Sequence, residues 1–382
     1  DGVRSDCKIS VEVNKEGGRD IELISKVKSL YGDSITQLVE SILNQFNITH
    51  VKVIIEDSGA LPHVIAARME AALKQAIDDE VEFLLPISHD GAFQPKPDRF
   101  RLSRLYLPGN NPSMMINAGI HYPDGIILDL EDSVAPEKKD EARILVRNTL
   151  RAIDFYGAER MVRINQLPLG LEDLKMVIPH QPELILIPKC EHDWQVKQVD
   201  ELISSLMKDD KNNPSVLLMP IIESAMGVEN AYAIAISSAR NVAMAIGLED
   251  YTADLGVSRT DSSRESFYAR TRIVNACKAA RIQPIDSVYS DVANESGLRE
   301  NVEESRSLGF EGMGCIHPSQ IRIIQEGFTP TEAEIEKAER IINAYKEAKE
   351  KGLGVVSLGS KMIDAPVVKR AEQTLALSRV CQ

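Results

Sequence analysis

Short β-type runs and two amphipathic helical patterns alternate in the first part of the chain. Runs rich in β-branched and other apolar residues, typical of strands, occupy residues 8–13, 20–25 and 50–57. Apolar side chains that recur every three or four positions predict two helices, from about Asp33 to Phe46 and from Ala60 to Ile77. The resulting order of strand, strand, helix, strand, helix predicts a small α+β (ββαβα) module over residues 1–85.

This periodicity stops at residues 86–100, which include the sequence ISHDGAFQPKPDRF. Gly91, Pro95 and Pro97 interrupt any regular element there. One alternative is a surface loop inside a single domain. The hydrophobic period differs before and after this segment, however, which favours a linker between two domains.

After the linker, short apolar runs alternate with helical stretches. The runs cover residues 104–108, 126–130, 161–165, 184–189, 216–223, 242–250, 284–288 and 314–318. Strands separated by helices indicate a parallel sheet, and eight such units within residues 101–328 predict a TIM (β/α)8 barrel. A doubly wound sheet would show similar alternation, but no Gly-x-Gly-x-x-Gly turn follows the first strand. Residues 329–382 contain a charged helix, a Gly-rich loop and another helix, and are predicted to form a C-terminal helical lid.

Composition narrows the classes of partner. The 382 residues carry a formal net charge of −14, so no broad basic surface is expected for the phosphates of a nucleic acid. No apolar stretch approaches the roughly 20 residues of a membrane span, and the polar start of the sequence does not resemble a signal peptide. We therefore expect a cytoplasmic protein without membrane partners. Because the sequence begins with Asp1, the native N-terminus is open.

Polar side chains gather at the ends of the predicted strands, which is where the active sites of TIM barrels lie. They are Asp129, Glu131, Asp132, Arg163, Asn165, Lys189, Glu223, Glu249, Asp250, Asp286 and His317. Each acid, taken alone, has an alternative role as a cap of the following helix. Several acids around one arginine and one lysine repel one another unless a cation intervenes. Oxygen ligands suit Mg2+, and Glu223 and Asp250, at the ends of the fifth and sixth strands, are the simplest ligand pair.

Six segments of the barrel region resemble a known family. They are LYLPGNNP (105–112), DGIILDLEDSVAPEKKDEAR (124–143), VRIN (162–165), PIIES (220–224), GLEDYTADLG (247–256) and GFEGMGCIHPSQI (309–321). They resemble the citrate lyase β-subunit and the related malyl- and citramalyl-CoA lyases of the HpcH/HpaI aldolase family. The resemblance runs from about Arg101 to the end of the chain.

The N-terminal module resembles a different protein, the acyl carrier or γ subunit of citrate lyase. The resemblance is carried by SDCKISVEV (5–13), SKVKSLYGDSI (25–35) and EDSGALPHVIAARMEAAL (56–73). It implies a CoA-derived prosthetic group on a serine, for which Ser5 is the nearest candidate. Alignment on Asp6 and Cys7 instead places that position on Arg4, which cannot carry a phosphodiester. A loaded carrier and a vestigial or docking module both remain open.

The resemblance also implies roles for individual residues. Glu223 and Asp250 would hold Mg2+, which would bind oxaloacetate or a similar 2-oxo acid. Arg163 would bind a substrate carboxylate and offset charge on the developing carbonyl oxygen. Glu131 would lie near the metal, either supporting its ligands or relaying protons. Asp364, in the segment KMIDAP, matches an acid/base aspartate that related lyases receive from the lid of a neighbouring protomer. A homo-oligomer with shared active sites is therefore expected.

Three further residues are predicted to bind substrate. Gly109 would allow the backbone to approach the thioester or CoA arm closely. Lys189 would contact a phosphate or carboxylate, or would pair with neighbouring acids. Asn165 follows Arg163 at the same strand end and is assigned to the substrate site with it.

The predicted reaction is the Mg2+-dependent retro-Claisen cleavage of a 3-hydroxy-acyl thioester, carried on CoA or on an acyl carrier, to an acetyl thioester and a 2-oxo acid. One alternative is a citramalyl- or malyl-CoA lyase with a vestigial carrier module. Another is a non-catalytic assembly subunit that docks other citrate lyase subunits.

Overall fold

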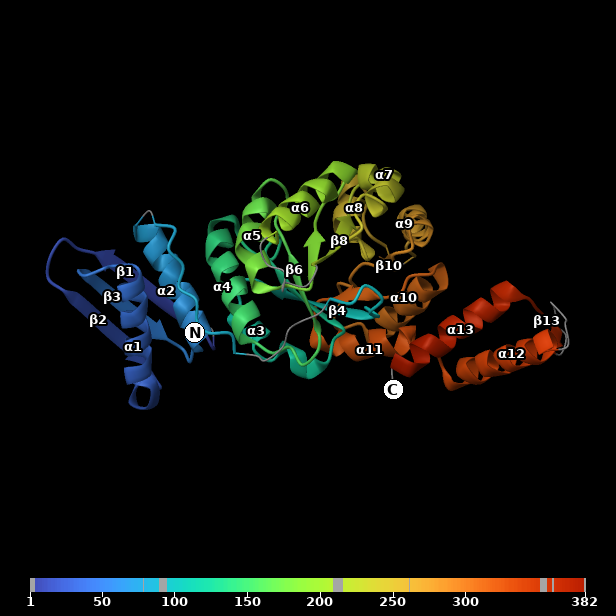
Figure 1. The fold of residues 1–382 in the computed structure, drawn as a ribbon, viewed down its shortest axis with the longest axis horizontal. Helices are drawn as coiled ribbons and strands as arrows, with labels where there is room; N and C mark the ends of the chain where they lie inside the picture. Colours follow the sequence, from blue (N-terminus) through green and yellow to red (C-terminus); the bar gives the residue numbers. More distant parts are fainter. Residues whose placement is uncertain are drawn as a thin grey trace.

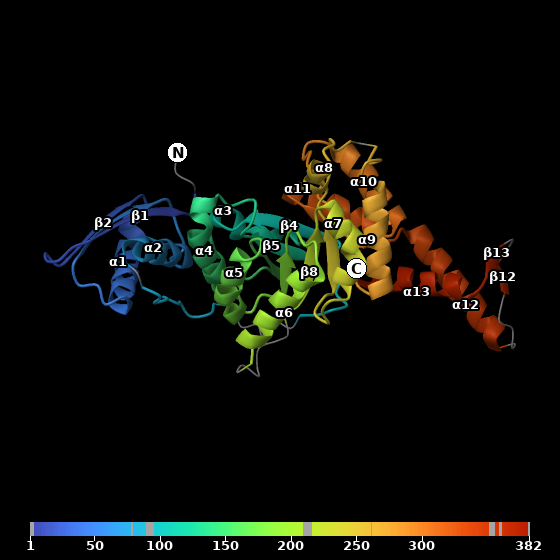
Figure 2. The same cartoon turned by 90° about the horizontal axis from the view of Figure 1, so that it is seen from above.

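The computed structural model describes residues 4–77, 79–88, 95–208, 216–260, 262–350, 356–358 and 361–380. An N-terminal module, a central barrel and a C-terminal helical hairpin lie in a row along the long axis of the molecule (Figures 1 and 2). None of the helices in these ranges is both long and apolar enough to cross a membrane.

The N-terminal module is a three-stranded sheet with two helices against it. Its elements are β1 (Cys7–Val13), β2 (Arg19–Ser25), α1 (Lys28–Gln45), β3 (Val51–Asp57) and α2 (Pro62–Ala76). β3 is the central strand, antiparallel to β1 and parallel to β2. Val51, Val53 and Ile55 alternate along β3 and are buried, because side chains on one face of a strand recur every second residue. The ββαβα order predicted from the sequence is confirmed.

The barrel sheet is entirely parallel. Its strands are β4 (Ser103–Pro108), β5 (Gly125–Asp129), β6 (Glu159–Arg163), β7 (Leu184–Ile187), β8 (Leu217–Ile222), β9 (Ala243–Ile246), β10 (Gln283–Ile285) and β11 (Met313–Cys315). They are ordered β10-β9-β8-β7-β6-β5-β4-β11. A parallel bridge between Asp286 and Met313 joins the two ends of this order. The TIM-barrel prediction is therefore confirmed.

Helices cover the outside of the barrel and its loops. They are α3 (Pro112–Met115), η1 (Ala118–His121), η2 (Pro136–Lys138), α4 (Lys139–Ala152), α5 (Leu169–Val177), η3 (Ile178–His180), α6 (Asp193–Leu206), α7 (Ala225–Ala235), α8 (Leu248–Asp254), α9 (Phe267–Ala280), α10 (Glu295–Leu308) and α11 (Pro318–Phe328). Along β5, Ile127 belongs to a core cluster inside the barrel, whereas Ile126 and Leu128 belong to the larger cluster that includes helical residues. Because side chains on both faces of each strand pack into a core, the strands appear in the sequence as continuous apolar runs.

The C-terminal hairpin consists of α12 (Glu332–Glu350), β12 (Val356–Leu358), β13 (Lys361–Ile363) and α13 (Ala365–Val380). β12 and β13 pair antiparallel. The two helices lie side by side and carry the β12–β13 ribbon to the end of the molecule far from the barrel (Figures 1 and 2).

Helix α2 belongs to two cores at once. Ile65, Met69 and Leu73 pack into the core of the module, whereas Val64, Ala67 and Ala71 pack into the large cluster of the barrel. Both figures show α2 beside α4 (Figures 1 and 2). The module is thus joined to the barrel by a buried apolar face of one shared helix.

Candidate active site

A cavity of about 770 Å3 opens at the carboxyl ends of the barrel strands. Its lining includes polar side chains from successive strand ends, namely Asp129, Asp132, Arg163, Glu223, Asp250, Asp286 and His317. Because all strands of a TIM barrel run in one direction, residues far apart in sequence meet at this end. The structure thus brings most of the predicted strand-end residues to one cavity.

Arg163, at the end of β6, is held by two neighbouring acids. Its Nε and Nη2 donate to the two carboxylate oxygens of Asp129 at 2.6 and 2.7 Å. Its Nη1 lies 3.0 Å from Oε2 of Glu131. The guanidinium also stacks over the ring of Tyr106, 5.2 Å from its centroid. Burial disfavours the charged form, but the hydrogen bonds and charge of Asp129 outweigh it and raise the pKa of Arg163.

Asp129 is the anchor of this arrangement, and its role was not assigned from the sequence. Its carboxylate accepts from the backbone N–H groups of Glu131 at 2.9 Å and Ser133 at 3.3 Å. Burial raises the pKa of Asp129, but its bonds to Arg163 outweigh burial and lower the pKa overall. A bidentate carboxylate fixes the plane of a guanidinium. The only signal for this role in the sequence was the presence of an acid at the preceding strand end.

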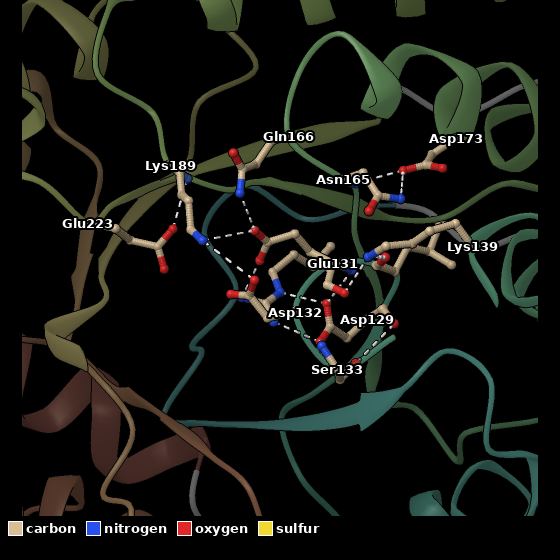
Figure 3. A network of polar contacts seen from close by, with 12 residues as sticks. Asp129, Glu131, Asp132, Ser133, Lys139, Asn165, Gln166, Asp173, Lys189 and Glu223 are labelled. Atoms are coloured by element: carbon tan, nitrogen blue, oxygen red, sulfur yellow. Dashed lines mark hydrogen bonds and ion pairs between the residues drawn. The ribbon is translucent and has the colours of Figure 1, made fainter. Parts of the chain in front are cut away.

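Lys189 occupies the centre of a group of acids (Figure 3). Its Nζ lies 3.5 Å from carboxylate oxygens of both Glu131 and Asp132, and 3.4 Å from Asp250. Burial lowers the pKa of Lys189, but the charges of these acids and Glu223 raise it further than burial lowers it. Of the two roles considered for Lys189, this geometry shows pairing with neighbouring acids.

Glu223, at the end of β8, is almost fully buried beside this group. One carboxylate oxygen accepts from the backbone N–H of Lys189 at 2.8 Å. A Cβ at Gly247 would come within 2.5 Å of its other oxygen, so a larger residue where β9 ends would displace the Glu223 side chain. Burial raises the pKa of Glu223 to about 8, and the charges of Glu131 and Asp250 raise it in the same direction. An additional cation at this place would favour the ionised form of Glu223.

The chemistry of these donors fits a hard divalent cation. Glu223 and Asp250 offer carboxylate oxygens and border the same cavity. Within the described ranges, no three His, Cys, Asp or Glu side chains are already placed to hold a metal ion together. Mg2+ typically uses one or two protein carboxylates and fills its other positions with water and substrate oxygens. The pair therefore suits Mg2+ better than a metal that needs a complete protein cage.

Other predicted residues lie outside the cavity. Asn165 is buried and donates through both its backbone N–H and its Nδ2 to Asp173, at 2.6 and 2.9 Å. Its amide is committed to fixing the loop after β6, so the structure does not bring it to the predicted substrate site. The close approach predicted at Gly109 is to the chain itself, because a Cβ there would meet the Asp129 carbonyl oxygen at 2.6 Å.

Asp364 and Ser5 lie on the two appendages. Asp364 follows β13, and its carboxylate accepts from the N–H of Val367 at 3.2 Å at the start of α13. The cavity of its own chain is not lined by Asp364, which lies with β13 at the far end of the hairpin (Figure 1). Ser5 is half-buried in a left-handed backbone conformation, two residues before the start of β1.

Comparisons with known proteins agree with the sequence motifs. Residues 102–318 match the family model described as HpcH/HpaI aldolase/citrate lyase, and residues 3–76 match that of malonate decarboxylase delta subunit (MdcD), an acyl-carrier-type family. The chain is 38% identical over 284 residues to citrate lyase subunit beta of Leuconostoc mesenteroides subsp. cremoris, covering 74% of this chain and 94% of the relative. It is 34% identical over 291 residues to the mitochondrial citramalyl-CoA lyase of Homo sapiens, covering 73% and 85% of the two chains.

Solved structures give the same result. The CitE protein of Mycobacterium tuberculosis, determined in complex with magnesium, acetoacetate and coenzyme A, is 27% identical with a TM-score of 0.60. The match covers 73% of this chain and 98% of that chain. Together these matches confirm the two resemblances inferred from the sequence, one for the barrel and one for the module.

Proposed function

The chain belongs to the HpcH/HpaI aldolase/citrate lyase family, and from that premise we propose that it is an Mg2+-dependent lyase of 3-hydroxy-acyl thioesters. The products would be an acetyl thioester and a 2-oxo acid such as oxaloacetate. The observation that carries the proposal is one cavity holding both an acid-anchored arginine and a pair of candidate metal carboxylates.

Arg163 would bind the carboxylate at the 2-oxo acid end of the substrate. Its Nε and Nη2 are occupied by Asp129, so the guanidinium has little freedom to reorient. A cation held in place does not have to reorganise as charge develops on the substrate, which is the main advantage of preorganised electrostatics. Lys189, on the other side of Glu131, would supply a second fixed positive charge near the 2-oxo acid end of the substrate.

The bond-breaking step starts at the substrate 3-hydroxyl. Asp364 of a neighbouring chain removes its proton, and the oxygen electrons form the carbonyl of the 2-oxo acid as the C2–C3 bond breaks. The electrons of that bond pass to the acetyl thioester, which becomes an enolate, and the same carboxyl then protonates its carbon. Glu131, whose pKa is raised by burial and by Asp132 although Arg163 opposes this, would act as a proton relay.

Mg2+ held by Glu223 and Asp250 would act as a Lewis acid that stabilises negative charge on the substrate oxygens. Burial raises the pKa of the Glu223 carboxyl to about 8. A cation bound beside it would favour the ionised form, which is the form that acts as a metal ligand.

The N-terminal module would act as the carrier of the thioester. Ser5 is the candidate attachment site, and its neighbour Asp6 is bound by Arg68, which also donates to the Asn110 carbonyl oxygen in the loop after β4. A group attached near the start of β1 would therefore lie close to the rim of the barrel cavity. The rival proposal is a citramalyl- or malyl-CoA lyase that uses free CoA thioesters, with a vestigial module.

A substrate screen tests the proposal. Purified protein with Mg2+ should release a 2-oxo acid from at least one of citryl-CoA, citramalyl-CoA and malyl-CoA. Glu223→Gln and Asp250→Asn should each lower kcat/KM by roughly 100-fold or more, because removing a preorganised charge-stabilising group typically costs that much. Asp254→Asn, one turn further along α8 and bonded to the N–H of Ala225, is the matched control and should retain activity. Equal activity of all three variants would contradict the metal assignment.

The carrier is tested separately by intact-mass spectrometry of protein purified from its native host. A mass increase corresponding to a CoA-derived group on Ser5 supports the loaded carrier. An unmodified chain that turns over free CoA thioesters supports the rival proposal.

A further inference from the structure

Arg68, on helix α2, lies where the module meets the mouth of the barrel. Only 9% of it is exposed. Its Nε and Nη2 donate to the two oxygens of Asp6 at 3.0 and 2.9 Å, and its Nη1 pairs with Glu141 of α4. The same Nη2 donates to the Asn110 carbonyl oxygen at 2.9 Å. One guanidinium therefore joins the start of β1, helix α4 and the loop after β4.

That loop borders the cavity directly. Pro108 precedes it and Ser113 follows it, and both line the cavity. Within the loop, the N–H of Gly109 donates to the Asp129 carbonyl oxygen at 2.7 Å. A Cβ at Gly109 would meet the same oxygen at 2.6 Å, so the loop and the end of β5 are in close contact. A movement of the loop would therefore displace the backbone of Asp129.

Asp129 in turn holds Arg163 by its two carboxylate oxygens. Every step from Arg68 to Arg163 is thus a hydrogen bond or a covalent neighbour: Arg68 to Asn110, Gly109 to Asp129, and Asp129 to Arg163. Such a continuous set of contacts can transmit coupling between two sites.

We propose that Arg68 is a positioning residue through which the N-terminal module sets the loop after β4 and the Arg163 guanidinium of its own barrel. The module then helps to position the active site whether or not it carries an acyl group. The effect on ligand affinity rests on the proposed function, because it assumes that Arg163 binds the carboxylate of a 2-oxo acid. The effect on the loop does not depend on the proposed function.

The interface itself offers a matched control. Glu70 lies on α2 close to Arg68 in sequence, and its oxygens accept from Arg147 of α4 at 2.7 and 3.0 Å. Both partners are fully buried. This pair holds the module to the barrel as Arg68 does, but among the described residues its hydrogen bonds and ion pairs do not include the loop after β4. Glu70→Gln should therefore weaken docking without moving the loop.

The first measurement is hydrogen exchange, by mass spectrometry, of the peptide that contains Gly109. Arg68→Met should raise the exchange rate of this peptide about tenfold relative to wild type, whereas Glu70→Gln should leave it within about twofold. Arg68→Lys keeps the charge but not the fork of donors, so it should give an intermediate rate. Equal changes in Arg68→Met and Glu70→Gln, or no change in either, would overturn the proposal.

The second measurement is the affinity for pyruvate in the presence of Mg2+, by calorimetry, together with KM and kcat. Arg68→Met should weaken pyruvate about tenfold and raise KM more than it lowers kcat, within the 5- to 150-fold range of typical coupling between sites. Glu70→Gln should leave both unchanged, and equal losses would overturn the proposal. Where wild type does not bind pyruvate, oxaloacetate or glyoxylate takes its place as the probe. If wild type binds none of the three, the proposed function fails, and the exchange rates still decide the role of Arg68.

Discussion

The two appendages of the barrel are attached in opposite ways. The N-terminal module shares a helix with the barrel core and is joined to it by the fully buried pair Glu70–Arg147. The C-terminal hairpin packs mainly on itself and extends beyond the barrel (Figure 1). Arg306 of α10 in the barrel and Glu334 of α12 in the hairpin form an ion pair at 3.0 Å, and both side chains are substantially exposed.

This difference indicates which active site each appendage serves. A module fixed by buried contacts can act reliably only on its own barrel, and Arg68 reaches the loop that borders the cavity of that barrel. If the hairpin contributes Asp364 to an active site, that site belongs to another chain, because Asp364 follows β13 and does not line the cavity of its own chain. We infer that the module works within the chain and that the hairpin works between chains, in an oligomer whose symmetry repeats the contact.

The largest effect is expected at the far end of the hairpin. Asp364→Asn should lower kcat by about 10^2- to 10^4-fold, the usual contribution of a positioned acid/base group. Stability should change little, because asparagine also caps a helix start well. Steady-state kinetics measure kcat, and a thermal melt measures the stability. Glu372→Gln, exposed on the same helix, is the control, and an equal loss in that variant would mean that the hairpin tolerates no change of charge.

Breaking the buried pair of the module should have the next largest effect. Glu70→Ala removes the buried carboxylate of Arg147 and leaves its guanidinium with only the partly exposed carboxylate of Glu82 at 3.0 Å. Breaking a buried ion pair on one side typically costs about 3–5 kcal/mol. Chemical denaturation should show this loss as an earlier transition. A variant as stable as wild type would mean that the module is not held by this pair.

Acid should weaken the module interface before it affects the hairpin. His63 on α2 is buried beside Asn148 and Arg151 of α4, and burial lowers its pKa from 6.5 to about 4. Below pH 6.5 the unfolded chain binds a proton that the folded chain does not. Stability from this group is therefore fully present above pH 6.5 and is lost as the pH falls towards 4.

Thermal melts from pH 7 to pH 5 should show a decrease in stability on the order of 1–2 kcal/mol from this residue. His63→Gln should reduce the pH dependence. His180, whose pKa burial and nearby arginines lower to about 3, should maintain part of it. A wild-type protein whose melting temperature is constant over this range would contradict the account.

The smallest effect is expected at the exposed pair between hairpin and barrel. Arg306→Ala should cost less than about 1 kcal/mol, as exposed ion pairs usually do. The contrast with Glu70→Ala is the informative quantity, measured under identical denaturation conditions. Comparable losses at the two pairs would remove the distinction between a fixed module and a loosely attached hairpin.

Much of the fold could be predicted from the sequence because each barrel strand packs between two apolar cores. Residues such as Ile126, Ile127 and Leu128 therefore form a short apolar run that periodicity detects. The gathering of strand-end acids followed from the common direction of the strands. Both inferences need only local pattern and the geometry of one fold.

The contacts that orient the site could not be predicted in the same way. Asp129 was visible only as one more acid, because its role depends on the orientation of Arg163 on the next strand. Asn165 was assigned to substrate from its neighbour, whereas the following loop turns its amide to Asp173. Arg68 has no signal in its own segment, since its importance comes from reaching Asn110 across the module interface.

Mixing two inactive variants tests the central claim most directly. Glu223→Gln removes a candidate metal ligand from the barrel, and Asp364→Asn removes the acid/base group from the hairpin. If sites are shared between chains, co-refolded or exchanged subunits in equal amounts should recover carbon–carbon cleavage to about a quarter of the wild-type rate, since one site in four combines two intact parts in a closed oligomer. A mixture as inactive as either variant alone would contradict the account.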